Sequence, residues 1–230
     1  MAQRACIVVL TGAGISAESG LQTFRDAGGL WEGHAIHDVA TPEAWARQPE
    51  VVNRFYNQRR QQLLQVAPNA AHIALAQLEQ RAEVRIITQN VDDLHERAGS
   101  TQVLHLHGQL LQVRSSSQPD EVYDWRGDLT RHDVDRQGQP LRPNIVWFGE
   151  AVPAMDTAVD WVQRADQVLV VGTSLQVYPA AGLLYDVPPQ VPITYIDPHP
   201  AQVTGIEKRL NALALTAVEG VPAWCESLFE

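Results

Sequence analysis

Short apolar runs rich in β-branched residues recur along this 230-residue chain, and segments of mixed polarity separate several of them. Continuous apolar runs of this kind are typical of strands that are buried on both faces of a sheet. We expect strands at Cys6–Leu10, Val84–Thr88, Val103–Leu106, Ile145–Phe148, Val168–Val171 and Ile193–Ile196. Helical patterns cover Pro42–Arg47, Val51–Val66, Asn69–Gln80 and Ala154–Arg164. This alternation predicts an α/β fold built on a Rossmann-like, doubly wound parallel sheet.

Two segments fall outside the alternation. The pattern of residues 28–66 predicts a helical insertion. Residues 111–143 are polar and rich in Ser, Asp and Gly without a clear period, so we expect either a small inserted lobe or a mobile loop there. Residues 1–27, 67–110 and 144–230 would then form the Rossmann-like domain.

The turn after the first apolar run has the glycine spacing of a dinucleotide-binding loop. Gly12, Gly14 and Ala17 match G-x-G-x-x-G/A, a pattern in which backbone N–H groups approach a pyrophosphate at the start of a helix. The same spacing also fits a plain tight turn. Its place at the end of a strand, shortly before the charged and aromatic segment Thr23–Asp26, favours the nucleotide site.

Polar or glycine clusters follow the other predicted strands as well. Ligands of doubly wound sheets bind at the carboxyl ends of the strands, so clusters at those ends indicate one shared site. The clusters are Gly12–Gly20, Gln89–Asp92, His107–Gly108, Gly172–Ser174 and Asp197.

Composition narrows the class of partner. The formal net charge of −10 disfavours broad binding to nucleic acid or to anionic membranes, although an acidic protein can hold a local basic pocket. No apolar run approaches the ~20 residues that span a bilayer, and the N-terminal segment lacks the features of a signal peptide. Because Cys6 and Cys225 are the only cysteines, we expect a cytoplasmic protein without structural disulfides.

Together these motifs resemble the sirtuin family of NAD-dependent protein deacylases. The matching segments, in family order, are Gly12–Ser16, Thr23–Arg25, Thr88–His95, His107–Gly108, Phe148–Glu150 and Gly172–Ser174. The resemblance implies that NAD is consumed as a co-substrate. It also implies that acyl-lysine proteins or peptides are the partners, and that nicotinamide and O-acyl-ADP-ribose are released.

The resemblance also implies roles for the polar clusters. His107 would be the general base, since a near-neutral pKa suits proton transfer. His105, two positions earlier on the same predicted strand, should point to the same face, but the family's base precedes a glycine. Asp92 would accept the nicotinamide carboxamide N–H, and Asn90 would fix the ribose and a water. The residues implied to bind NAD are Gly12, Ala13, Gly14, Ile15, Glu18, Phe24, Arg25, Gln89, Asn90, Val91, Asp92, Gly172, Thr173, Ser174, Asp197 and Ala217.

One of these positions departs from the family pattern. Asp197 stands where the family has asparagine. A carboxylate there could accept both hydroxyls of the adenosine ribose, but it lacks the donor of the amide.

Two segments resemble the edges between which the family adds a substrate strand by backbone hydrogen bonds: Ile145–Glu150 and Leu175–Tyr178.

Tyr56 and Arg59 share one face of a predicted helix, and Arg can hold a carboxylate bidentately. The alternative is that this face of the helix is basic and exposed to solvent and binds no carboxylate. Tyr-x-x-Arg and the small Ala40 resemble the corresponding residues of the subgroup that removes succinyl and malonyl groups. Removal of acetyl groups stays open as a further activity. The expected substrate contacts are Ala40, Tyr56, Arg59, Val146, Phe148, Gly149, Glu150 and Val177.

Most sirtuins hold a structural zinc ion on two Cys-x-x-Cys pairs. The corresponding positions here are Ser115, Gln118, Val134 and Gln137, none of which is a credible zinc ligand. His132, Asp133 and Asp135 make a poor alternative set. We therefore expect no zinc and expect residues 111–143 to be held by packing alone.

Two other functions stay open. The chain could transfer ADP-ribose to a protein or to water, as an ADP-ribosyltransferase or an NAD glycohydrolase. It could also be a non-catalytic NAD-sensing module, although such a module has no need of a base such as His107.

Overall fold

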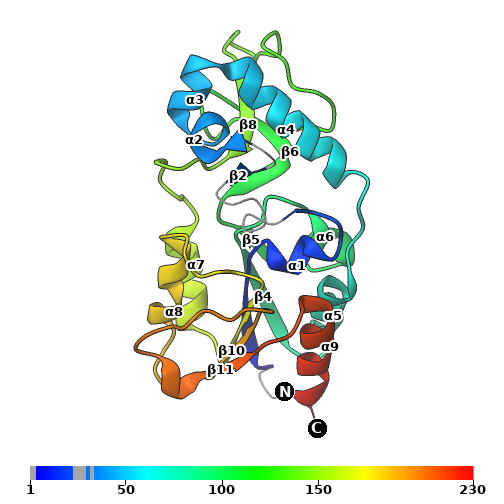
Figure 1. Ribbon diagram of the computed structural model, residues 1–230, viewed down its shortest axis with the longest axis vertical. Helices are drawn as coiled ribbons and strands as arrows, with labels where there is room; N and C mark the ends of the chain where they lie inside the picture. Colours follow the sequence, from blue (N-terminus) through cyan, green and yellow to red (C-terminus); the bar gives the residue numbers. More distant parts are fainter. Residues whose placement is uncertain (1–3, 23–29, 32–33, 230) are drawn as a thin grey trace.

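The computed structural model describes residues 4–22, 30–31 and 34–229. In these ranges, six parallel strands form the main sheet in the order β11-β10-β9-β1-β4-β5 (Figure 1). Their bounds are β1 (Cys6–Thr11), β4 (Glu83–Thr88), β5 (Val103–His105), β9 (Gln167–Val171), β10 (Ile193–Ile196) and β11 (Leu210–Leu213). The strand order reverses at β1, so the predicted Rossmann-like, doubly wound sheet is confirmed.

Both faces of this sheet are covered, which explains why its strands are continuous apolar runs. Alternate side chains of β1 enter two separate cores: Val8 and Leu10 pack on one face, and Ile7 and Val9 pack on the other. Figure 1 shows the covering helices on either side of the sheet. The first core includes α7 (Met155–Gln163) and α8 (Leu183–Asp186), and the second includes α5 (Ala70–Leu78) and α9 (Ala217–Ser227).

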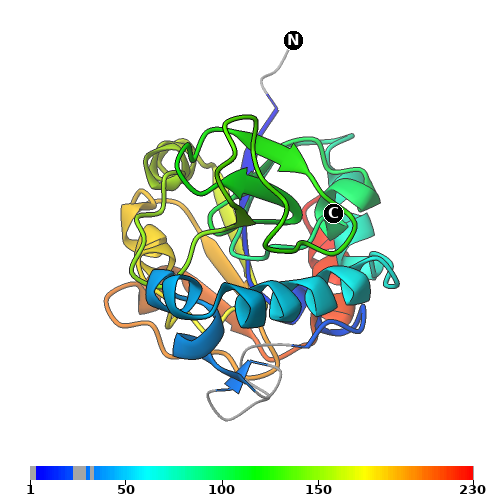
Figure 2. The same cartoon turned by 90° about the horizontal axis from the view of Figure 1, so that it is seen from above.

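The inserted segments form a lobe at the carboxyl ends of the main strands (Figures 1 and 2). An antiparallel sheet there has the order β7-β6-β8 among the described residues, and α4 packs against β6 and β8. Residues 111–143 contribute β7 and parts of β6 and β8 to this sheet. The lobe elements are β2 (Leu30–Trp31), β3 (His34–Ala35), α2 (Ile36–Val39), α3 (Pro42–Arg47), α4 (Pro49–Leu63), β6 (Gly108–Ser115), β7 (Val122–Asp124) and β8 (Leu141–Ile145).

The predicted helices are confirmed in α3, α4, α5 and α7, with small shifts at their ends. The Thr41 side chain accepts the Ala44 N–H and so caps α3, and Pro49 is the first residue of α4. Several elements carried too weak a pattern to be predicted. They include α6 (Leu94–Ala98), the half-exposed β11, and α9, which contains Pro222. The helix expected at the glycine turn is the short α1 (Gly14–Ala17).

One predicted strand is wrong over most of its length. Strand β8 ends at Ile145, the first residue of the expected run Ile145–Phe148, and residues 146–148 are not in a strand. The Phe148 N–H donates to the carbonyl of Ala40 at 3.0 Å, and the Trp147 N–H donates to the Glu150 carboxylate at 2.8 Å. The Glu150 N–H also donates to the Trp147 carbonyl at 3.0 Å, which closes a turn. The apolar side chain of Trp147 is buried in the core of the lobe.

A buried hydrogen bond joins two turns of the lobe at the positions where zinc-binding cysteines were considered. The Ser115 hydroxyl donates to Asp135 Oδ2 at 2.6 Å and accepts the Gln118 N–H at 3.1 Å. Asp135 Oδ1 accepts the N–H groups of Gln137 and Gln139, both at 2.8 Å. In the part of the chain that the structure describes, no three His, Cys, Asp or Glu side chains gather as metal ligands, so the residues present do not fit zinc. Hydrogen bonds thus add to the packing that was expected to hold the lobe alone.

Among the described residues, none of the helices has the length and apolar character needed to cross a membrane.

Candidate functional site

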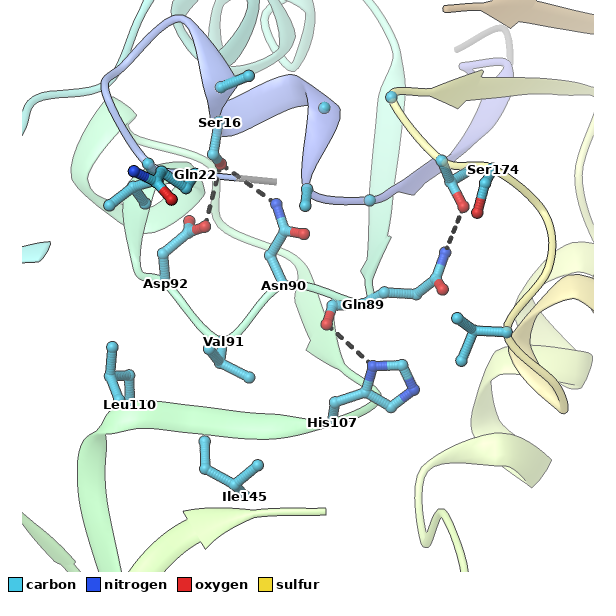
Figure 3. Close-up of a pocket in the computed structure, with 18 of the residues that line it drawn as sticks. Ser16, Gln22, Gln89, Asn90, Val91, Asp92, His107, Leu110, Ile145 and Ser174 are labelled. Carbon is cyan, nitrogen blue, oxygen red and sulfur yellow. Dashed lines mark hydrogen bonds between the residues drawn. The ribbon is translucent and has the colours of Figure 1, made fainter. Parts of the chain in front are cut away.

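A cavity of about 590 Å³ lies between the carboxyl ends of the main strands and the lobe. Turns after β1, β4, β9 and β10 line it on the side of the sheet. The lobe contributes α4 and the segment that follows β8. Figure 3 shows part of this cavity and the polar side chains that converge on it. A cavity at the reversal point of a doubly wound sheet is where such folds bind nucleotides.

The turns after β1 and β9 pack backbone against backbone. The Gly12 N–H donates to the Val171 carbonyl at 3.0 Å, and the Gly14 N–H donates to the Gly172 carbonyl at 2.8 Å. A Cβ atom at Gly14 would lie 2.6 Å from Gly172 Cα, so no side chain fits there. The glycine spacing is therefore required by the contact between the two turns. The N–H groups of Gly12 and Gly14 bind protein carbonyls and do not point at an anion.

Ser16 bridges two side chains of the loop formed by residues 89–92, the carboxylate of Asp92 and the amide of Asn90 (Figure 3). Its hydroxyl donates to Asp92 Oδ2 at 3.0 Å and accepts from the Asn90 amide at 3.2 Å. Asp92 Oδ1 also accepts the Leu94 N–H at 3.1 Å. Burial nevertheless raises the pKa of Asp92 to about 6, so this carboxyl group titrates close to neutral pH.

His107 faces the cavity with one ring nitrogen held by the backbone. Its Nδ1 lies 3.0 Å from the Gln89 carbonyl oxygen and must donate to it, which leaves Nε2 as the basic nitrogen of the neutral ring (Figure 3). Burial lowers the pKa of His107, so the ring is neutral and able to accept a proton at neutral pH.

His105 does not share the cavity with His107. Strand β5 ends at His105, so the two-residue alternation that predicted a common face stops there. The His105 ring instead lies between the Asn90 carbonyl and the Glu96 carboxylate, 3.1 and 2.7 Å away.

The end of the cavity toward β9 and β10 is rich in oxygen atoms. The Gln89 amide donates to the Thr173 hydroxyl at 3.0 Å, and the Tyr195 hydroxyl donates to the Thr173 carbonyl at 2.6 Å. Asp197 is buried beside the cavity and accepts the His199 N–H at 2.9 Å. Hydroxyl, amide and carboxylate groups of this kind suit the ribose and phosphate groups of a dinucleotide.

The lobe contributes a tyrosine and an arginine from α4. Tyr56 is fully buried, and its hydroxyl accepts the indole N–H of Trp147 at 3.0 Å. Burial raises the pKa of Tyr56, which keeps the hydroxyl protonated. Arg59 lies one helical turn away, with its guanidinium carbon 5.2 Å from the centre of the Phe55 ring. Both Tyr56 and Arg59 line the cavity that His107 faces.

The segment after β8 is fixed by an ion pair. The Glu150 carboxylate accepts from both terminal nitrogens of Arg142, at 2.7 and 3.0 Å, and from the Trp147 N–H. The guanidinium of Arg142 also lies 3.4 Å from the centre of the Trp147 indole. Glu150 therefore holds this edge of the cavity in place with a carboxylate that is already hydrogen-bonded.

The cavity brings together nearly all of the predicted site residues. Within the described ranges, every one of them lines it except Ile15, whose side chain is buried in the core beneath. Phe24 and Arg25 lie outside the described residues. Five further lining residues lie inside predicted motifs but were given no role of their own: Ser16, Ala17, Ile145, Trp147 and Tyr178. The lining residues outside the predicted motifs are Leu21, Gln22, Gln62, Leu63, Leu110, Val152, Pro179, Pro198, His199 and Thr216. Many of these directly adjoin a predicted motif, but Gln62, Leu63 and Leu110 carried no signal of their own.

Comparison with known proteins agrees with this geometry. The model of the Sir2 family matches residues 12–179. An NAD-dependent protein deacylase of Helicobacter pylori is 58% identical over 192 residues, which are 84% of this chain and 84% of that protein. An NAD-dependent protein deacylase of Bacteroides thetaiotaomicron is 51% identical over 221 residues, 94% of each chain. A crystal structure of a Sir2 homolog–NAD complex superimposes with a TM-score of 0.88 at 39% identity and covers 98% of this chain and 90% of that one. The chain belongs to the Sir2 family, the family of the sirtuins.

Proposed function

We propose that this chain is an NAD-dependent protein-lysine deacylase that prefers the acidic acyl groups succinyl and malonyl and also accepts acetyl. One observation carries the acyl preference: Tyr56 and Arg59 line the same cavity as His107. The named relatives are NAD-dependent protein deacylases, and a homologous structure holds NAD. These relatives support the coarser activity, and the residues of the cavity support the acyl preference.

The sheet side of the cavity fits NAD, whose glycosidic bond supplies the activated carbon of the reaction. Asp92 and Asn90 are held by Ser16 at the inner end, where they can bind the nicotinamide carboxamide and the adjacent ribose. Thr173 and Asp197 offer oxygen atoms to the adenosine half. Nε2 of His107 faces the cavity as a neutral base and would take a proton from a ribose hydroxyl.

The lobe side of the cavity would hold the acyl group. A guanidinium can donate two parallel hydrogen bonds to a carboxylate, and partial burial strengthens such a charged contact. Burial of Arg59 is marked enough to lower its pKa, so its charge is poorly solvated. The Trp147 indole N–H donates to the hydroxyl of Tyr56, which lines the same cavity as Arg59, and so fixes that hydroxyl in place. Ala40 is small and lines the same cavity, which leaves room for an acyl chain longer than acetyl.

The peptide would lie between two segments at the mouth of the cavity. Phe148 is 45% exposed there, next to Val146 and Gly149, and Val177 lies on the other side. The Arg142–Glu150 ion pair fixes the first of these edges. A substrate strand could add to such a fixed edge through backbone hydrogen bonds.

The proposal is tested by incubating the protein with NAD and with succinyl-, malonyl- or acetyl-lysine versions of one peptide, followed by mass spectrometry. We expect loss of the acyl group together with equimolar nicotinamide and O-acyl-ADP-ribose. Nicotinamide release without loss of the acyl group would instead indicate an NAD glycohydrolase. ADP-ribose attached to protein would indicate a transferase, and intact NAD would indicate a non-catalytic module.

A further inference from the structure

We infer that His105 is a positioning residue of this site: together with Glu96 it holds the Asn90 carbonyl and places a positive charge behind the 89–92 loop. The inference rests on the proposed function, because that loop is the one proposed to bind NAD. His105 lies outside the set of described residues that line the cavity, so it acts through the loop and does not touch substrate.

Both ring nitrogens of His105 face hydrogen-bond acceptors. Nδ1 lies 3.1 Å from the Asn90 carbonyl oxygen, and Nε2 lies 2.7 Å from Glu96 Oε1 on helix α6. A carbonyl and a carboxylate can only accept, so both nitrogens must donate and the ring must carry a positive charge. The His105 side chain is only 6% exposed, whereas that of Glu96 is 39% exposed. Burial opposes the charge, but the Glu96 carboxylate outweighs it and raises the pKa of His105.

The pair fixes the backbone of the loop at a residue that the proposed mechanism needs. The Asn90 N–H donates to the Thr88 hydroxyl at 3.0 Å, and the Asn90 carbonyl is held by His105. The preceding carbonyl, that of Gln89, is held by His107. Two histidines thus bind consecutive carbonyls, so the backbone is fixed on both sides of the Cα atom that carries the Asn90 side chain.

The charge of His105 also acts on Asp92. Among the described residues, the titratable groups that interact with His105 are Glu96 and His95 from α6 and Asp92 from the loop. Burial keeps His95 neutral, which leaves Glu96 and Asp92 as the charged neighbours. His105 lowers the pKa of Asp92 against the opposing effect of burial, so the pair helps to keep this carboxylate ionised.

The test removes the charge of Glu96 without changing its size. Calorimetric titration with NAD compares the wild type, Glu96→Gln and the control Glu83→Gln between about pH 5 and about pH 8. Glu83 is a matched control, because it is also a half-exposed acid paired with a base, Arg85, but it lies at the start of β4. We expect Glu96→Gln to weaken NAD binding at neutral pH by about tenfold, as for the loss of one charge-assisted hydrogen bond. As the pH is lowered, Glu96→Gln should also lose NAD binding at a higher pH than the wild type does, because Asp92 would protonate more easily.

A merely structural role of Glu96 would lower thermal stability but would leave the pH dependence of NAD binding unchanged, and that result would overturn the inference. Equal affinity and pH dependence of all three proteins would overturn it as well. Glu96→Asp, which restores the charge, should bring the pH dependence back toward that of the wild type. Because the readout is NAD binding, a wild type that binds NAD but leaves acyl-lysine intact would contradict the proposed function and not this inference.

Discussion

The Ser115 hydroxyl donates a 2.6 Å hydrogen bond to the Asp135 carboxylate, and both side chains are almost fully buried. Each of the two side chains also accepts backbone N–H groups from its own turn. The contact therefore joins two turns of the lobe, which also carries β6 and β8 toward the cavity. A polar pair thus helps to hold the lobe together at the positions where zinc ligands were considered.

Removal of the serine hydroxyl should destabilise the lobe. In Ser115→Ala, the Gln118 N–H and one oxygen of Asp135 lose their partner, so we expect a loss of about 1–3 kcal/mol in the free energy of unfolding. Urea denaturation measures it. The exposed neighbour provides the control, since Ser116→Ala removes a hydroxyl from the surface. Equal stabilities of the two variants would show that the buried bond contributes little.

The lobe should also be indifferent to metal chelation. Because the Ser115 hydroxyl and the Asp135 carboxylate bind each other and backbone N–H groups, EDTA should change neither the melting temperature nor the NAD-dependent activity. Elemental analysis of the purified protein is the direct check. One tightly bound zinc ion per chain would contradict this account of the lobe.

A side chain at Gly14 should separate the two turns that form the floor of the cavity. The new Cβ atom of Gly14→Ala would lie 2.6 Å from a backbone atom of Gly172, so the backbone must move. We expect at least about tenfold weaker NAD binding, because shifts of this size at a binding site are costly. Gly127→Ala is the control, since a Cβ atom at Gly127 meets nothing within 4 Å. NAD affinity of Gly14→Ala equal to that of the control would refute this reading of the glycine spacing.

The pH dependence of kcat/KM for NAD should fall off on the acid side. The ionised Asp92 carboxylate accepts a stronger hydrogen bond than the protonated group does, and the pKa of Asp92 is about 6, so activity falls as pH drops through that value. His107 must be neutral, and burial places its pKa below the ordinary value, so it adds a second loss at lower pH. In Asp92→Asn, only the protonation of His107 should remain as a cause of the acid-side loss, so kcat/KM should fall less steeply as the pH is lowered. His107→Ala should abolish turnover. An acid limb that is identical in Asp92→Asn would exclude Asp92 as its source.

The sequence predicted the sheet and the rim of the cavity for a physical reason. Strands buried on both faces leave continuous apolar runs, and polar clusters at their ends must share one edge. Local patterns could not reveal contacts between distant segments. The Ser16–Asp92 and Trp147–Tyr56 hydrogen bonds join residues 76 and 91 positions apart, and neither leaves a spacing to read. The expected strand Ile145–Phe148 continues past the end of β8 at Ile145, because burial in a turn and burial in a strand give the same apolar pattern.

The ratio of kcat/KM for succinyl-lysine to that for acetyl-lysine, on one peptide with saturating NAD, tests the proposed acyl preference most directly. The wild type should favour succinyl-lysine. Arg59→Met should lower succinyl-lysine turnover by about 100-fold, as for the loss of a bidentate charged contact, and leave acetyl-lysine turnover nearly unchanged. Arg54→Met, on the exposed side of the same helix, should keep the wild-type ratio. Equal losses on both substrates in Arg59→Met would contradict the proposal that Arg59 binds the acyl carboxylate.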